Sequence, residues 1–221
     1  MSSYAIMYVS LLMIVTSLVA VEWRMLPEAV HTYQVQSVLI ALIFALYAHS
    51  LHNPALYFWS GTALVSKGLI VPWLLRHYVL KIHNKETPPL LSILPSQALG
   101  ILAALLAFVW VFKHHDGLVI LPSLAGEPFR MNLAVAAAIL TIGFYALLTR
   151  RDAFKIVIGL CLLENGVHLS LISLAPSIPE TALIGVVTDV VVSVAMLLYI
   201  VTGVYRSAGS LDTSHIAQLR G

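Results

Sequence analysis

The stretch from Gly159 to Leu169 reads Gly-Leu-Cys-Leu-Leu-Glu-Asn-Gly-Val-His-Leu and lies within a long apolar segment, from about Phe154 to Ala175. Such a segment is long enough to cross the hydrocarbon core of a bilayer as a helix. It would place the Glu164 carboxyl near mid-membrane, which costs roughly 2.5–3.5 kcal/mol on insertion scales. A cost of this size indicates that the Glu164 carboxyl has a specific role that justifies its burial.

The composition places the whole chain in the membrane. Hydrophobic residues make up 60% of it, charged residues 10%, and the mean hydropathy is +0.93. A soluble domain usually has about 25% charged residues. The net charge of +2 is too small to suggest nucleic acid as a partner. Cys161 is the single cysteine, which excludes an internal disulfide and a cysteine-held cluster or zinc site.

The apolar runs predict an all-α polytopic membrane protein with about seven transmembrane helices, because long unbroken runs exclude a β-barrel. We expect one transmembrane domain over residues 1–221, made of a four-helix part (1–130), a three-helix part (131–206) and a cytoplasmic tail (207–221). The expected spans are Tyr4–Val21, Val35–Leu51, Ala55–Val79, Pro95–Phe112, Met131–Thr149, Ala153–Ala175 and Thr181–Tyr205.

The distribution of basic residues predicts the orientation, because cytoplasmic loops are enriched in lysine and arginine. With the N-terminus outside, only Lys113 and Arg130 face out, and Lys67 lies within a span. The remaining basic loop residues then face the cytoplasm: Arg24, Arg76, Lys81, Lys85, Arg150, Arg151, Lys155, Arg206 and Arg220. We therefore expect the N-terminus outside and the C-terminus in the cytoplasm.

Glu164 and His168 are four residues apart, so they share one helix face and can reach each other. This spacing favours a proton-exchanging carboxyl with His168 as a relay or partner. The alternative is that Glu164 and its neighbour Asn165 only hold helices together through hydrogen bonds. Two titratable groups on one face favour the first interpretation.

Asp189 is a second acid, about midway along the next apolar run. Thr188 precedes it, and Ser193 follows one turn later on the same face. Asp189 could be a helix-interface residue satisfied by these hydroxyls, but two carboxyls on adjacent spans indicate a path for protons or ions. Asn165, Thr188 and Ser193 are the expected polar partners at the helix interfaces.

Lys67 lies inside the third span, in the sequence Ser-Lys-Gly-Leu-Ile-Val-Pro that ends at Pro72. Proline cannot donate to the carbonyl four residues earlier, here that of Gly68, so the helix should kink or loosen there. Lys67 is too far from either end of its span to reach the headgroups comfortably, which argues against snorkelling. We expect a functional charge beside a broken helical turn.

The sequence offers no Ser-His-Asp arrangement, no nucleotide-binding loop and no cluster of metal ligands. We therefore expect no catalytic residue, no metal site and no cofactor-binding site in this chain.

Three strings resemble hydrogenase-4 component E, a membrane subunit of formate hydrogenlyase-type complexes built around a group 4 [NiFe] hydrogenase. They are Arg-Arg-Asp ahead of Ile-Gly-Leu-Cys-Leu-Leu-Glu-Asn-Gly-Val-His-Leu, the later Ile-Gly-Val-Val-Thr-Asp, and the terminal Gly-Ser-Leu-Asp with Leu-Arg-Gly. The stretch from Lys67 to Pro72 resembles the same family. The likeness runs over nearly the whole chain and is densest after Arg150.

The last three spans also resemble the small three-helix subunit of complex I and its counterpart in multisubunit cation/proton antiporters. That subunit carries a glutamate on each of its last two helices, and Asp189 occupies the second position. Cys161 stands where the first glutamate is usual, and Glu164 follows one turn later on the same stripe. Leu183 replaces a further glutamate found in some hydrogenase-4 relatives.

The resemblance implies a multi-pass subunit of the bacterial or archaeal cytoplasmic membrane. Its partners would be antiporter-like membrane subunits, a membrane anchor subunit and cytoplasmic hydrogenase subunits that hold the [NiFe] centre and iron–sulfur clusters. Electron transfer there would be coupled to movement of protons or sodium through buried charges, here Glu164, Asp189, Lys67 and His168.

Three other functions are compatible with parts of the pattern. The same carboxyls suit a subunit of a monovalent cation/proton antiporter without redox partners. A purely structural anchor is the second alternative. A seven-helix retinal protein is disfavoured, because its Schiff-base lysine would be expected in the last span, and Thr181–Tyr205 has none.

Overall fold

The computed structural model describes residues 2–80, 93–118, 126–176 and 180–212; the side chains of 180–189 lie outside this description. Within these residues, seven helical rods are long and apolar enough to span a membrane, which confirms the predicted all-α polytopic class. The elements are α1 (Ser2–Glu22), α2 (Leu26–Leu51), α3 (Pro54–Ala63), the π-helix η1 (Leu64–Ile70), α4 (Val71–Val79), α5 (Ile93–Leu118), α6 (Glu127–Thr149), α7 (Ala153–Leu174) and α8 (Glu180–Ala208).

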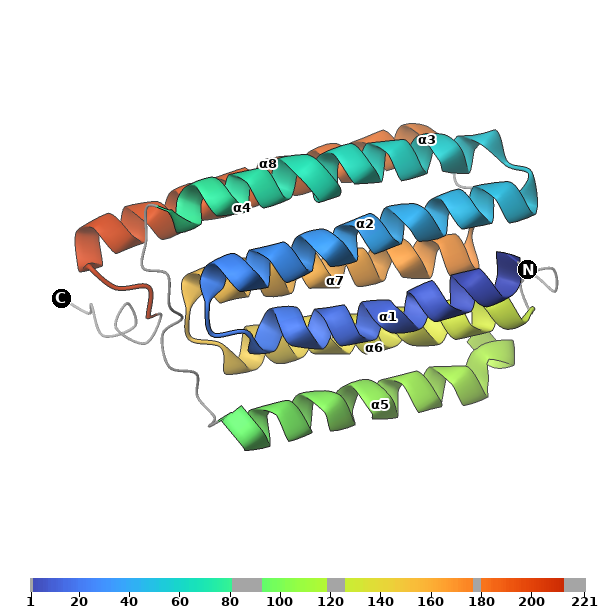
Figure 1. The fold of residues 1–221 in the computed structure, drawn as a ribbon, viewed down its shortest axis with the longest axis horizontal. Coiled ribbons are helices and arrows are strands. Elements are labelled where there is room, and N and C mark those ends of the chain that lie inside the picture. Colours follow the sequence, from blue (N-terminus) through green and yellow to red (C-terminus); the bar gives the residue numbers. More distant parts are fainter. Residues whose placement is uncertain (1, 81–92, 119–125, 177–179, 213–221) are drawn as a thin grey trace.

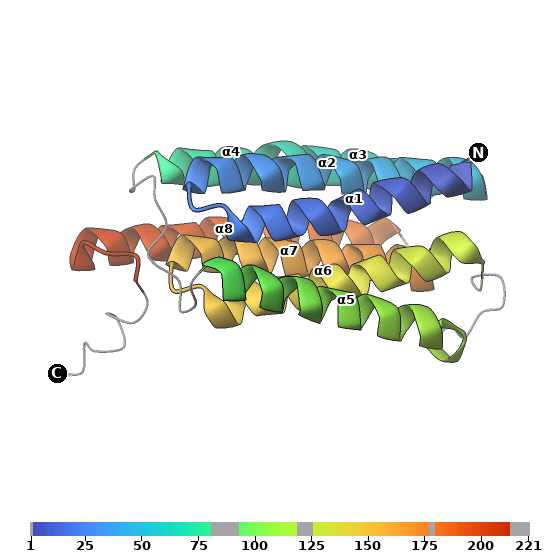
Figure 2. The same cartoon turned by 60° about the horizontal axis from the view of Figure 1, so that its bottom comes forward.

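The rods run along one common axis, and α3, η1 and α4 form a single continuous rod (Figure 1). The helices α1, α2, α6 and α7 form the middle of the bundle, with α5 against α6 at one edge. At the other edge α8 packs on α7 and on the α3–η1–α4 rod (Figure 2). A polar side chain at the middle of α7 is therefore surrounded by other helices.

Helices α6 and α7 approach each other closely because glycines line their contact. A Cβ atom at Gly143 would lie 2.9 Å from the backbone nitrogen of Leu163, and one at Gly166 would lie 3.0 Å from that of Leu140. Small residues permit such close packing of helices in membranes. Because this face of α7 is committed to α6, residues on its other side point toward α2, η1 and α8.

The turn between α2 and α3 is tight. His52 adopts a left-handed conformation (φ 52°) at the end of α2. The side chain of Asn53 accepts a hydrogen bond from the backbone N–H of Ala55 (3.1 Å), and Pro54 begins α3. This short connection makes α2 and α3 antiparallel neighbours.

The predicted start of the second span at Val35 is wrong, because α2 begins at Leu26. The polar turn that suggested a later start is buried: Gln36 and Ser37 have no exposed surface. Polar groups can lie within a span when they face the bundle and find partners there. The additional turns of α2 bring Gln36 into the interior.

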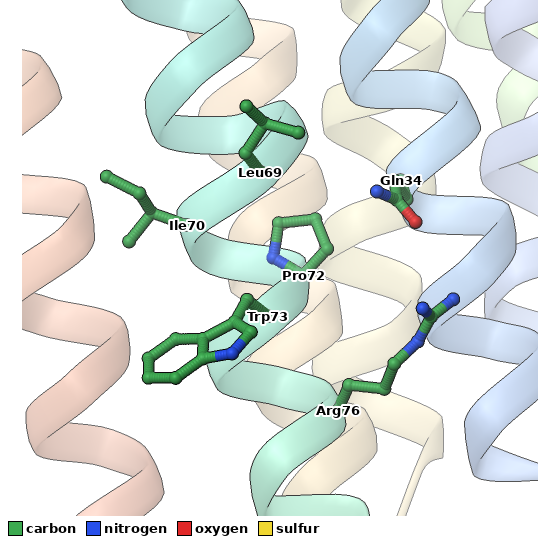
Figure 3. A pocket seen from close by; sticks show the side chains of 6 residues that line it. All are labelled: Gln34, Leu69, Ile70, Pro72, Trp73 and Arg76. Carbon is green, nitrogen blue, oxygen red and sulfur yellow. The ribbon is translucent and has the colours of Figure 1, made fainter.

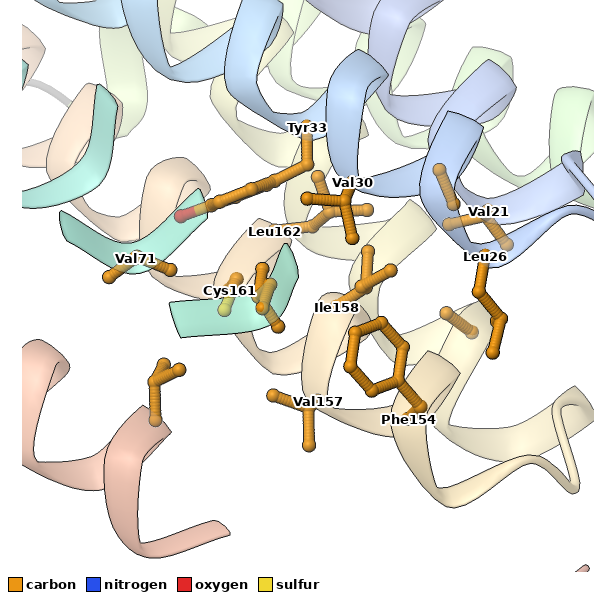
Figure 4. Close-up of a cluster of buried hydrophobic side chains, with 14 of the residues drawn as sticks. Val21, Leu26, Val30, Tyr33, Val71, Phe154, Val157, Ile158, Cys161 and Leu162 are labelled. Atoms are coloured by element: carbon orange, nitrogen blue, oxygen red, sulfur yellow. The ribbon is translucent and has the colours of Figure 1, made fainter. Parts of the chain in front are cut away.

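An apolar core fills the space where α1, α2, α4 and α7 meet. Figure 4 shows Val30 and Tyr33 of α2 beside Ile158, Cys161 and Leu162 of α7. The Cys161 side chain is 1% exposed. This core fixes the rotation of α7 and so the direction in which its polar residues point.

Candidate functional site

The start of α7 is set by Asp152. Its carboxylate accepts hydrogen bonds from the backbone N–H groups of Phe154 (2.9 Å) and Lys155 (3.4 Å), a standard N-cap. From this start, Glu164 and His168 fall on the face of α7 that looks toward η1. The predicted placement of both residues on one helix face is confirmed.

Lys67 lies in the π-helix η1, where the helical turns are widened. The N–H of Val71 bonds to the carbonyl of Ser66, one residue further back than in an α-helix. Pro72 has no N–H for the carbonyl of Gly68, and the side chain of Gln34 donates to that carbonyl instead (3.1 Å). The predicted broken turn beside Lys67 is present, and it is repaired by a side chain from α2.

Figure 3 shows this region from the outside of the bundle. Gln34 and Pro72 line a pocket of about 430 Å³ together with Leu69, Ile70, Trp73 and Arg76. The pocket lies between α2 and the η1–α4 part of the third rod. Single-turn π segments often occur at functional sites, and this one turns Lys67 away from the pocket into the interior.

The ammonium group of Lys67 meets three acceptors on α7. Its Nζ atom lies 2.9 Å from the Oε1 atom of Glu164, 2.9 Å from the Oδ1 atom of Asn165 and 2.9 Å from the Nδ1 atom of His168. A lysine ammonium has three donors, so each finds a partner. Only 1% of Lys67 is exposed, which excludes snorkelling.

One ring nitrogen of His168 meets two partners. Its Nδ1 atom lies 2.9 Å from the Nζ atom of Lys67 and 2.9 Å from the backbone carbonyl oxygen of Glu164. With the ring proton on Nε2, Nδ1 accepts from the ammonium; with the proton on Nδ1, it donates to the carbonyl. The same Nδ1 atom lies 3.6 Å from Oε1 of Glu164. His168 is buried, and its Nε2 atom has no hydrogen-bond partner among the described residues.

Glu164 connects this buried cluster to a cavity between α7 and α8. The cavity measures about 350 Å³, and Glu164, Cys161 and Leu160 line its α7 side. Ser193 and Val190 lie on the opposite wall. The side chain of Glu164 is 22% exposed, whereas that of Lys67 is 1% exposed. Glu164 is therefore the member of the ion pair that outside groups can reach.

Two predicted residues fall where the structure describes no side chains. Asp189 and Thr188 lie in the helical backbone of α8, but their side chains are outside the described part of the chain. Val190, the next residue, lines the cavity beside Glu164. Ser193, expected as a polar partner of Asp189, lines the same cavity.

The sequence analysis missed a hydrogen-bonded network that extends from the ion pair to α1. The Nδ2 atom of Asn165 donates to the Oε1 atom of Gln36 (3.0 Å). The Nε2 atom of Gln36 donates to the hydroxyl of Ser17 (2.7 Å). The polar residues Gln34, Gln36 and Ser37 near the expected start of the second span were the available signal, because buried polar groups need partners.

A second buried ion pair was also missed, at the end of the bundle where α1 stops. Arg150 pairs with Glu22, and it also donates to the hydroxyl of Ser96 (3.2 Å). The hydroxyl of Tyr145 donates to the Ser96 carbonyl (2.8 Å). Arg150 lies in the connection between α6 and α7, as expected, but it is only 4% exposed and ties α1, α5 and α6 together.

Lys155, a basic residue expected in a loop, lies instead in the first turn of α7. Its side chain is 1% exposed, and its Nζ atom donates to the carbonyls of Ala20 (2.9 Å) and Val21 (3.1 Å). These carbonyls belong to the last turn of α1, which lacks helical donors and carries a partial negative charge. Lys155 thus caps α1 from within α7.

The comparisons with known proteins agree with this architecture. Residues 131–221 match the family model of NADH-ubiquinone/plastoquinone oxidoreductase chain 4L. The NAD(P)H-quinone oxidoreductase subunit 4L of a Nostoc species is 31% identical over 97 residues, which covers 96% of that protein and 41% of this chain. The chain belongs to the chain 4L family.

The similarity to hydrogenase-4 component E extends much further. The Escherichia coli and Shigella flexneri proteins of that name are each 29% identical over 210 residues, covering 95% of this chain and 94% of theirs. The chain is thus a membrane protein homologous to component E, with a chain 4L domain at its C-terminal end. No solved structure gives a significant match.

The match to chain 4L divides the ion pair. Glu164, Asn165 and His168 lie inside the matched region, whereas Lys67 and Gln36 precede it. The similarity to component E covers nearly all of the chain and so both halves of the site. The positive charge that neutralises Glu164 therefore comes from the part that chain 4L lacks.

Proposed function

We propose that this chain is an integral membrane subunit of a complex I-like, group 4 [NiFe] hydrogenase-type complex. In this proposal Glu164 and Asp189 belong to its path for protons or sodium ions, and Lys67 and His168 relay or tune the charge. The homology to component E and the chain 4L domain support the type of complex.

The ion pair between Lys67 and Glu164 carries the functional part of the proposal. A buried ion pair stabilises a protein weakly, because desolvation of the charges offsets their attraction. Its retention at mid-membrane favours a use that requires charge to change. Protonation of Glu164 from the cavity would neutralise the carboxylate and leave Lys67 without its anionic partner. Proton exchange between the cavity and Glu164 is thereby coupled to the charge of Lys67 in the interior of the bundle.

The redox centres of such a complex would reside in other subunits. Among the described residues, no three His, Cys, Asp or Glu side chains gather as metal ligands, and the chain has one cysteine. A [NiFe] centre or an iron–sulfur cluster, which would supply electron transfer, does not fit this donor set. The proposed partners are cytoplasmic hydrogenase subunits, antiporter-like membrane subunits and a membrane anchor subunit.

The proposed orientation places the N-terminus outside and the C-terminus in the cytoplasm. Arg150 and Lys155 are buried and so weigh less in the argument for this orientation. Arg24, Arg76 and Arg206 remain exposed at the same end of the bundle and support it. A cysteine-reactive probe that cannot cross membranes, applied to single cysteines placed after residue 212, tests this orientation in intact cells.

Glu164→Gln is the direct test of the ion path. In inverted membrane vesicles we expect the assembled variant to retain hydrogenase activity with an artificial electron carrier. The ratio of protons moved to electrons transferred should fall severalfold, because the amide cannot exchange a proton. Glu28→Gln is the matched control, since Glu28 is exposed near the start of α2. An unchanged ratio in assembled Glu164→Gln would refute the proposal.

A gentle detergent purification through a C-terminal tag tests the type of complex. We expect hydrogenase subunits to co-purify with stoichiometric nickel and iron. Antiporter-like membrane chains without either metal would instead support the antiporter alternative. Isolation of the chain alone, stable and monodisperse, would contradict both assignments.

A further inference from the structure

We infer that Gln36 and Ser17 are positioning residues that hold Lys67 in its charged form opposite Glu164, through a chain of hydrogen bonds with one fixed direction. The inference rests on the proposed function, because it assigns the chain a role in the charge state of that site. Both residues precede the region matched to chain 4L.

Every bond in this chain donates away from Lys67. Lys67 donates to Oδ1 of Asn165 (2.9 Å), and Nδ2 of Asn165 donates to Oε1 of Gln36 (3.0 Å). Nε2 of Gln36 donates to the hydroxyl of Ser17 (2.7 Å), which donates to the carbonyl of Met13 (2.6 Å). The chain thus runs from an ammonium to a backbone carbonyl across α7, α2 and α1.

The direction of the chain is tied to the charge of Lys67. A charged ammonium only donates, so Asn165 must present its oxygen to it. If Asn165 turned its NH₂ group toward Lys67, the nitrogen of lysine would need a free lone pair and therefore a neutral amine. Gln36 would then have to turn as well, and Ser17 would have to release the Met13 carbonyl. The anchored end therefore keeps the Asn165 oxygen turned toward Lys67. This oxygen stabilises the ammonium more than a neutral amine, because a hydrogen bond from a charged donor is stronger.

Burial makes this preference strong. Ser17, Gln36 and Asn165 have no exposed surface. Bulk water does not reach an amide that points the wrong way, and an unpaired buried polar group is costly. Hydrogen bonds in such a chain also polarise one another in the same sense. The dipoles of these aligned hydrogen bonds therefore add, and their negative ends point toward Lys67.

The chemistry of the chain separates its role from that of the ion path. Side-chain amides hold their N–H protons firmly, so Asn165 and Gln36 transmit orientation and do not carry protons. The groups around Lys67 that can change charge are Glu164 and His168 of α7, with Cys161 and Tyr33 beside them. Gln36 acts on these groups only through Asn165 and Lys67.

The test compares two substitutions at one position in the assembled complex. Gln36→Leu keeps the volume but removes both hydrogen bonds, and we expect the ratio of protons to electrons to fall about three- to tenfold. Gln36→Glu keeps an acceptor for Asn165, and we expect it to restore at least half of the loss. Thr32→Val is the control, because the Thr32 hydroxyl donates to the Glu28 carbonyl of its own helix, outside this chain of hydrogen bonds.

The outcomes separate this inference from the proposed function. If Gln36→Leu leaves the ratio unchanged while Glu164→Gln lowers it, the inference is wrong and the ion path stands. If neither substitution matters, the proposed function fails. Equal losses with leucine and glutamate at position 36 would also overturn the inference, since packing alone would explain them. If Gln36→Leu prevents assembly, Ser17→Ala is the deciding variant. An unchanged ratio of protons to electrons in Ser17→Ala refutes the role of the hydrogen-bonded chain. A loss of about twofold or more supports it.

Discussion

Replacing Lys67 by methionine should destabilise the protein more than any exposed lysine substitution. Lys67→Met keeps an unbranched side chain of similar length but removes the ammonium. The carboxylate of Glu164 then loses a partner at 2.9 Å, and Asn165 and His168 each lose a donor. Glu164 remains as a negative charge inside the bundle with its main counter-charge removed.

The size of the effect follows from burial. Removing one member of a buried ion pair costs about 3–5 kcal/mol. Glu164 is 22% exposed toward the cavity, so partial hydration lowers our expectation to about 2–3 kcal/mol. In the double variant Lys67→Met with Glu164→Gln, no charge is stranded. Its cost should lie at least about 2 kcal/mol below the sum of the two single costs.

The measurement is equilibrium unfolding of the purified chain in mixed micelles with increasing sodium dodecyl sulfate. The wild type, the two single variants and the double variant form a thermodynamic cycle. Lys113→Met is the matched control, because Lys113 is exposed on α5. It should change the free energy of unfolding by less than about 0.5 kcal/mol.

Two results would contradict the reasoning. Equal costs of Lys67→Met and Lys113→Met would mean that the ammonium contributes nothing in the middle of the bundle. The second result is a double variant whose cost equals the sum of the two single costs. Additive costs would show that Lys67 and Glu164 do not interact energetically.

Two further predictions concern the packing around the site. Gln34→Leu leaves the Gly68 carbonyl without its donor and should cost about 1 kcal/mol; adding Pro72→Ala, which restores a backbone N–H, should recover most of this loss in the same unfolding assay. Gly143→Ala places a methyl group 2.9 Å from a backbone atom of α7 and should cost about 1–3 kcal/mol. The control Gly203→Ala meets no atom within 4 Å and should be nearly neutral. Equal melting temperatures of the two glycine variants would argue against the close approach of α6 and α7.

Local sequence features predicted much of the architecture. Hydrophobic run length predicted seven spans, because the bilayer sets a minimum length for any helix that crosses it. The spacing of Glu164 and His168 predicted a shared face, and Pro72 predicted the loosened turn beside Lys67. Each of these inferences uses residues within a few positions of one another, where helical geometry alone decides.

The missed features depend on contacts between distant segments. Gln36 and Asn165 are 129 residues apart, and no local pattern shows that α2 and α7 meet in this register. Arg150 and Lys155 were counted as basic residues near the ends of spans, which is the only property that rules of topology use. Both side chains point inward, where Glu22 and the last carbonyls of α1 supply negative charge. Such contacts between distant segments leave no local pattern in the sequence.

The separation of Lys67 from its partners along the chain has a consequence for synthesis. Asn165 follows Lys67 by 98 residues. At roughly 5–20 residues per second, the ribosome needs about 5–20 s to make this length. During that interval the third rod, Pro54–Val79, has entered the insertion machinery with a lysine and no acceptor from α7. It has the lowest mean hydropathy of the seven candidate spans. Its stable residence in the bilayer therefore depends on a helix that the ribosome has yet to translate.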